Sequence, residues 1–175
     1  MSWFMVDVET DGSAPGLYSM IQIGVIIMTK TYATHVEFFG QLKPISKKYL
    51  PEALACTGIS RKDTEAFDDP EEVMHKFYNW IRALNEPKTR PMFISDNNGF
   101  DFAFINYYFW RFLGENPFGH SSTNLGSLYH GWKNDMFHNF KHLRKTEHTH
   151  NPVDDARGNA EALYEMIRQG FKFKL

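Results

Sequence analysis

The sequence has one cysteine, no long apolar run and no strong excess of charge of either sign. Because Cys56 is the single cysteine among 175 residues, no disulfide can form within the chain, which fits a reducing compartment. We expect Cys56 to be a small buried side chain. No apolar segment is long enough to span a bilayer, and the N-terminus lacks a signal-peptide pattern. These absences predict a cytoplasmic protein with no membrane partner.

Internal repeats, low-complexity tracts and linkers are also missing, so residues 1–175 are expected to form a single domain. A chain of this length can bury a sufficient core without disulfides. Its formal net charge of −2 argues against a protein that coats nucleic acid, because such affinity requires the neutralisation of many phosphates. An enzyme that grips only a chain end is compatible with this charge. Aromatic residues make up 16% of the chain, and those outside the core are available to stack on bases.

The spacing of apolar residues predicts an α/β protein. The predicted strands cover residues 2–8, 18–28, 33–42 and 92–95, and the first three form an antiparallel meander because short turns join them. The predicted helices cover about 70–84, 100–113, 125–132 and 152–169. Weak patterns predict short helical turns and loop over 45–69, and loop with at most one edge strand over 114–124.

The first predicted strand carries two carboxylates, Asp7 and Glu9, on one of its faces. In so apolar a run two like charges resist burial, and a bound divalent cation is the simplest compensation. The alternative is a strand end that emerges into solvent, with Asp11-Gly12 as an ordinary turn. The stretch by itself leaves both interpretations open.

Further acids lie at the ends of other predicted elements. Asp101 is in the first turn of the helix that follows strand 92–95, where open α/β sheets place their sites. Asp155, with His150 just before it, opens the last predicted helix. Three separate segments therefore bring acids to element ends.

These segments match three sequence patterns in a fixed order: residues 7–12 match D-x-E-T-x-G, 97–101 match N-x-x-F-D, and 150–157 match H-x-x-x-x-D-A-R. The patterns resemble the motifs of the DEDD-type 3′–5′ exonucleases of the histidine subtype, including small stand-alone exoribonucleases of the ribonuclease T kind. Residues 21–24 and 57–60 are similar to two further segments of that family. The resemblance implies a ribonuclease H-like mixed sheet, in which the antiparallel meander is joined by one or more parallel strands and flanked by helices.

The resemblance also implies a metal-dependent reaction. Asp7, Glu9, Asp101 and Asp155 would hold two Mg²⁺ or Mn²⁺ ions, since these cations prefer oxygen ligands. His150 would take the proton from the attacking water. Asp154 and His148 are rivals of Asp155 and His150, but the motif spacing favours the latter pair, leaving Asp154 as a cap or solvent-facing acid and His148 as an exposed loop residue.

The implied substrate is the 3′ end of single-stranded RNA or DNA, with a mild preference for RNA, and the implied products are nucleoside 5′-monophosphates. The resemblance places Thr10, Gly12, Asn97 and Phe100 at the terminal nucleotide. Small relatives of this kind often act as homodimers. Basic residues Lys141, Arg144 and Lys145 either guide phosphates or form a solvated face.

Two departures from the family pattern affect these expectations. Asp96 precedes Asn97 where a small residue or a histidine is more usual, which affects the expected substrate contacts near Asn97. A strand expected after the second helix is not recognisable in residues 121–128.

Three other functions compete with an RNA-trimming exonuclease. One is a 3′–5′ exodeoxyribonuclease, and another is a non-catalytic nucleic-acid-binding relative, although the complete set of acids argues against the latter. The third is a zinc protein built on histidines, of which His138 and His142 have helical i, i+4 spacing. The candidate zinc ligands are His130, His138, His142, His148 and His150.

Overall fold

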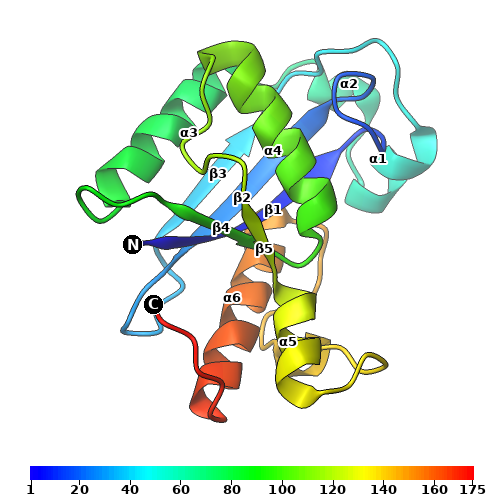
Figure 1. Ribbon diagram of the computed structural model, residues 1–175. Coiled ribbons are helices and arrows are strands. Elements are labelled where there is room, and N and C mark those ends of the chain that lie inside the picture. The colour runs from blue at the N-terminus through cyan, green and yellow to red at the C-terminus, as the bar shows by residue number, and fades with distance from the viewer.

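The computed structural model describes residues 1–175, which form a five-stranded mixed sheet with helices on both faces (Figure 1). The strands are β1 (Trp3–Thr10), β2 (Met20–Met28), β3 (Glu37–Gln41), β4 (Met92–Ser95) and β5 (Ser122–Asn124). The helices are α1 (Pro51–Thr57), α2 (Arg61–Thr64), α3 (Pro70–Leu84), α4 (Asn98–Leu113), α5 (Leu125–Lys133) and α6 (Pro152–Arg168), with a 3₁₀ turn η1 (Lys141–Leu143). The predicted α/β mixed sheet is confirmed.

The strand order across the sheet is β3-β2-β1-β4-β5. β1 pairs antiparallel with β2, and β2 pairs antiparallel with β3, which confirms the predicted meander. β4 and β5 extend the other edge of β1 as parallel strands. All nine residues of β2 are buried, as expected for an apolar strand covered on both faces.

A separate apolar core covers each face of the sheet, because successive side chains of β1 point to opposite faces. Phe4, Val6 and Val8 pack with residues of α3 and α4. Met5 packs on the other face with residues of α5 and α6. Figure 1 shows these two pairs of helices on opposite sides of the strands. By alternation, Asp7 and Glu9 share the face of Met5, so the carboxylates are directed towards the α6 side.

The helices α3 and α6 both begin at a proline, and in each a side chain caps the first turn. The Asp69 carboxylate accepts hydrogen bonds from the first-turn amides of α3, and Pro70 occupies its first position. Asn151 caps α6 in the same way, and Pro152 follows it. The start of α6 is therefore fixed, and with it the position of the acids in its first turn.

Several predicted boundaries differ from the structure. β3 begins at Glu37, opposite Ile26, so residues 33–36 precede the paired register instead of belonging to the strand. Two weakly patterned regions agree with the prediction: 45–69 contains the short helices α1 and α2, and the edge strand allowed within 114–124 is the three-residue β5. Cys56 is exposed on α1, so the expectation of a buried cysteine was wrong.

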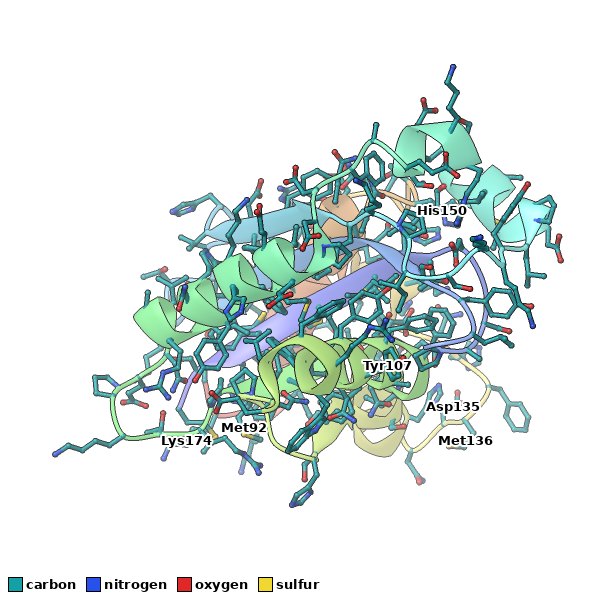
Figure 2. All side chains as sticks on the ribbon, turned by 90° about the horizontal axis from the view of Figure 1, so that it is seen from above. Met92, Tyr107, Asp135, Met136, His150 and Lys174 are labelled. Atoms are coloured by element: carbon teal, nitrogen blue, oxygen red, sulfur yellow. The ribbon has the colours of Figure 1, made fainter.

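Residues 134–151 connect α5 to α6 with η1 as their only helical turn. Figure 2 shows His150, near the end of this segment, at the opposite end of the molecule from Met92 and Lys174. None of the helices is long and apolar enough to cross a membrane.

Candidate active site and metal centre

The structure brings the predicted acids together at the end of β1. Asp7, Glu9 and Asp155 each offer a carboxylate oxygen, and these oxygens lie within 4.8 Å of one another. Asp101, 4% exposed in the first turn of α4, is close enough to raise the pKa of Asp7 electrostatically. Three elements that are distant in the sequence therefore supply one cluster of four acids.

A glycine in β2 permits the close approach of α6. Gly24 lies opposite Asp7 in the β1–β2 register. A Cβ atom at Gly24 would lie 2.1 Å from the carbonyl carbon of Pro152, at the start of α6. Only glycine leaves room for the backbone of α6 at this position. The close packing of α6 on β2 places Asp155 on the same side of the sheet as Asp7.

Burial and mutual repulsion raise the pKa values of the acids. Burial raises the pKa of Asp7 well above its ordinary range, and the charges of Asp101, Glu9 and Asp155 raise it further. Burial and neighbouring acids raise the pKa of Glu9 to about 8. The pKa of Asp101 rises to about 7, chiefly through burial. The protein alone therefore provides little compensation for four ionised carboxylates in one place.

Arg144 supplies a positive charge beside the cluster and lowers the pKa of Asp7. Its side chain is only 8% exposed, and its guanidinium donates to Asn159 Oδ1 and, at 3.4 Å, to Asp96 Oδ2. The Arg144 side chain is therefore not part of a solvated basic face, while its role in guiding phosphates stays a prediction. Asp96, which departs from the family pattern, is its partner.

The residues of the cluster fit hard divalent cations. Asp155 is 1% exposed, and its Oδ2 atom has no hydrogen-bond partner although it is buried. A buried carboxylate oxygen without a partner is costly unless a cation is bound to it. Oxygen ligands alone, in a cluster with raised pKa values, are the donor set that Mg²⁺ and Mn²⁺ take.

The two histidines before α6 lie beside Asp155. The rings of His148 and His150 are 4.3 Å apart between centroids, and His148 Nδ1 lies 2.8 Å from Asp155 Oδ1. His148 is an exposed loop residue, as predicted, and this contact also ties it to Asp155. His150 has a backbone φ of 57°, a left-handed conformation that non-glycine residues rarely adopt. Asp154 instead pairs with Arg157, 2.6 Å away.

The larger histidine cluster of the zinc hypothesis does not form. His138 and His142 do not share a helix, because residues between α5 and η1 are irregular. His138 contacts Asp135, and His142 contacts the carbonyl of Asn139. Of the five histidines, His148 and His150 alone belong to a group of potential ligands.

The residues predicted at the terminal nucleotide lie around the same end of the sheet. Thr10 is buried, and its hydroxyl donates to the Gly12 carbonyl at 2.8 Å. A Cβ at Gly12 would collide with the ring of Tyr18, so packing within the protein already requires this glycine. Asn97 is the exposed residue at the α4 N-terminus and makes no capping bond. Phe100 is half-buried against Phe104, with ring centroids 5.1 Å apart.

One ion pair near the site was not predicted. Asp11 is fully buried just after β1, and Arg61 at the start of α2 lies 2.5 Å from its carboxylate. The Ser19 amide also donates to Asp11, and Arg61 reaches the Ser46 carbonyl. A lone acid in a turn predicts solvent exposure, so the sequence carried no signal for this contact.

Fold and site together define a ribonuclease H-like domain with the acid cluster of a metal-dependent nuclease. The family model described as "Exonuclease" matches residues 4–163. The 3′–5′ DNA exonuclease Cap18 of Escherichia coli is 35% identical over 170 residues, which cover 93% of this chain and 89% of that protein. The chain therefore belongs to this exonuclease family, and it is a 3′–5′ exonuclease of the DEDDh type, a family that uses divalent metal ions.

Solved structures have the same fold. The nuclease domain of 3′hExo, a DEDDh family member bound to rAMP, superimposes with a TM-score of 0.80 at 16% identity, covering 99% of this chain and 94% of that one. Escherichia coli exonuclease I, solved with single-stranded DNA and zinc, gives 0.74 at 18% identity, covering 96% of this chain and 40% of that one. The ribonuclease H-like fold predicted from the sequence is confirmed.

Proposed function

We propose that residues 1–175 act as one exonuclease domain that shortens single-stranded nucleic acid from its 3′ end and releases nucleoside 5′-monophosphates. The observation that supports this most is the convergence of four acids, three of them with raised pKa values, at one end of β1. Such a cluster ionises fully only when cations are bound. We propose two Mg²⁺ or Mn²⁺ ions as the cofactor.

The residues of the cluster have separate tasks in this proposal. Asp7 would contact both ions, Glu9 and Asp155 would hold the ion beside the attacking water, and Asp101 would hold the other. When bound, the ions stabilise charge on the attacking and leaving oxygens of the phosphodiester. His150 would accept the proton of the attacking water, since its ring adjoins the Asp155 side of the cluster.

The terminal nucleotide would contact Thr10, Gly12, Asn97 and Phe100. Asn97 is the exposed member of this set, so its amide is free to bind a phosphate or sugar. Thr10 and Gly12 are buried and joined to each other by a hydrogen bond, so we assign them the shaping of the turn that lies beside the nucleotide. Phe100 would present its half-buried ring to a base.

The choice of polymer is the finer part of the proposal. The sequence resemblance favoured RNA by analogy with small exoribonucleases, and that preference remains a prediction. The 35% identical relative over nearly the whole chain is named a DNA exonuclease. We therefore propose single-stranded DNA as the first substrate to test, with RNA of the same sequence as the comparison.

A time course on 5′-labelled and 3′-labelled single-stranded DNA and RNA tests the proposal. With Mg²⁺ or Mn²⁺, the 5′-labelled strand should shorten stepwise, the 3′ label should leave first as a mononucleotide, and EDTA should stop both reactions. Products that retain the 3′ label while the 5′ end shortens would contradict the direction. Light scattering on the same samples decides whether the expected homodimer forms.

Single substitutions test which side chains hydrolysis requires. Asp7→Asn and Asp155→Asn should reduce turnover by at least about 10³-fold, because each removes a ligand of the ions. Asp154→Asn is the matched control, since Asp154 faces Arg157 and should leave turnover within a factor of about three. His150→Ala should lower kcat by roughly 10²–10⁴-fold with little change in KM, as expected for a general base. A large rise in KM would instead assign His150 to substrate binding.

A further inference from the structure

His148 and His150 form a second group of potential metal ligands beside the acid cluster. One ring nitrogen from each histidine and one carboxylate oxygen of Asp155 lie within 4.8 Å of one another. His148 Nδ1 already lies 2.8 Å from Asp155 Oδ1, and the two rings are 4.3 Å apart between centroids. The exonuclease mechanism uses His150 and Asp155 but assigns nothing to His148.

The donors of this second group differ chemically from those of the acid cluster. Two imidazole nitrogens and one carboxylate oxygen suit Zn²⁺ and similar transition-metal ions, whereas Mg²⁺ prefers oxygen ligands. Tetrahedral Zn²⁺ with bonds of about 2.0–2.1 Å holds neighbouring ligand atoms about 3.3 Å apart. The 2.8 Å separation of His148 and Asp155 would need to open only slightly, and the other separations, which are at most 4.8 Å, would need to close by no more than about 1.5 Å.

Asp155 belongs to both groups of potential ligands, and its two oxygens have different surroundings. Its Oδ1 atom faces the histidine segment, where it contacts His148 and accepts a hydrogen bond from the Thr149 amide at 3.1 Å. Its Oδ2 atom is buried without a partner. An ion bound to the histidines would therefore take the Oδ1 atom, which already faces them, and would draw on a carboxylate that the reaction also requires.

We propose that His148, His150 and Asp155 form an inhibitory site for Zn²⁺, separate from the ions held by the four acids. Binding there would occupy a ring nitrogen of His150, so that this ring could not accept the proton of the attacking water, and would engage the carboxylate of Asp155 that the catalytic ions also need. This inference rests on the proposed function in one respect, the roles of His150 and Asp155. The binding site itself follows from the ligand set alone.

Zinc binding to the metal-free protein tests the site without any nuclease reaction. Competition with a chromophoric chelator should show one Zn²⁺ per chain in the wild type and in Asp7→Asn, which removes an acid of the catalytic cluster but no proposed zinc ligand. His148→Gln should weaken binding at least tenfold, whereas His142→Gln, an exposed histidine of the same segment, should not change it. His148→Cys should restore binding, because a thiolate is a strong zinc ligand.

Inhibition measurements then test whether zinc bound at this site stops the nuclease reaction. Zn²⁺ should inhibit the Mg²⁺-supported reaction, and a tenfold increase in Mg²⁺ should not relieve the inhibition, since Mg²⁺ does not compete for imidazole. His148→Gln should require at least tenfold more Zn²⁺ for half-inhibition, relative to its own zinc-free rate. Circular dichroism of each variant verifies that it is folded.

The possible failures are distinguishable. If Asp7→Asn binds no zinc, or if Mg²⁺ relieves inhibition in proportion to its concentration, zinc occupies the acid cluster and the inference is wrong. If zinc binds with the predicted dependence on His148 but the protein does not shorten nucleic acid, the proposed function fails and the binding site stands.

Discussion

Arg144 shows how a single buried residue connects the acid cluster to its surroundings. Its guanidinium joins Asp96, after β4, to Asn159 on α6, and its charge lowers the pKa of Asp7. Its stem also packs against Gly158, where a Cβ would lie 3.2 Å from Arg144 Cδ. In the metal-free protein this residue supplies part of the positive charge that bound cations would otherwise provide.

Replacement of Arg144 should therefore destabilise the metal-free protein more than the metal-bound one. We expect Arg144→Met to lower the free energy of unfolding in EDTA by about 1–3 kcal/mol, because it leaves buried polar groups without partners. Added Mn²⁺ should reduce the difference. Urea unfolding with and without Mn²⁺ measures both values. Lys141→Met, an exposed change in the same segment, is the control, and an equal loss in that variant would contradict the buried role.

At the scale of elements, the site depends on how closely α6 approaches β2. The contact at Gly24 leaves no room for a side chain, and Gly24 lies opposite Asp7. The position of Asp155 relative to Asp7 is thus set by backbone packing between a strand and a helix.

Gly24→Ala should displace the start of α6. Overpacking of this kind costs about 1–3 kcal/mol, and turnover should fall because Asp155 moves away from Asp7. Gly131→Ala is the matched control, since a Cβ at Gly131 in α5 meets nothing within 4 Å. That change should stabilise the protein by about 0.5–1 kcal/mol. Thermal unfolding and turnover of both variants check this; full activity in Gly24→Ala would show that the contact does not position Asp155.

A second contact between elements, the Asp11–Arg61 ion pair, fixes α2 against the turn after β1. Removing one partner leaves a buried charge uncompensated, so Arg61→Gln should destabilise the protein by up to about 3–5 kcal/mol. Because the Arg61 side chain is partly exposed, the loss should lie below this upper limit. The double variant Asp11→Asn, Arg61→Gln should recover part of this loss. Urea unfolding of the single and double variants measures the coupling, and strictly additive losses would contradict it.

For the whole molecule, the raised pKa values link folding to pH and metal. The folded protein keeps protons on Glu9 up to about pH 8 and on Asp101 up to about pH 7, whereas the unfolded chain releases them near 4.5 and 3.8. Between these limits the folded state binds more protons, so stability is greatest at the acidic end and is lost as pH rises.

The metal-free protein should therefore have a lower Tm at pH 8.5 than at pH 5.5, by several degrees, since about 1 kcal/mol corresponds to roughly 2–4 °C in a domain of this size. Mn²⁺ should raise Tm more at pH 8.5, where its ligands are deprotonated. Thermal scans in EDTA and in Mn²⁺ measure this, with Glu9→Gln expected to flatten the pH dependence. A Tm that rises with pH in EDTA would contradict the assignment.

The sequence predicted those features of the fold that repeat locally or match a motif. The meander followed from alternating apolar residues, and the four acids followed from three motifs in order. The contacts of Arg144, Asp11 and His148 could not be predicted, because each joins a loop residue to a partner through packing that leaves no periodic signal. Arg144 in particular has the same local sequence context whether it faces solvent or lies buried beside Asp96.

The alternation of β1 between two cores also limits how this protein can misfold. A shift of one residue in the pairing of β1 with β2 would turn Asp7 and Glu9 into the apolar core of α3 and α4, and would place Phe4, Val6 and Val8 towards α6. Two carboxylates without cations could not be accommodated there. The acids proposed for hydrolysis thereby make the shifted register unfavourable during folding, and neutral replacements such as Asp7→Asn weaken that penalty.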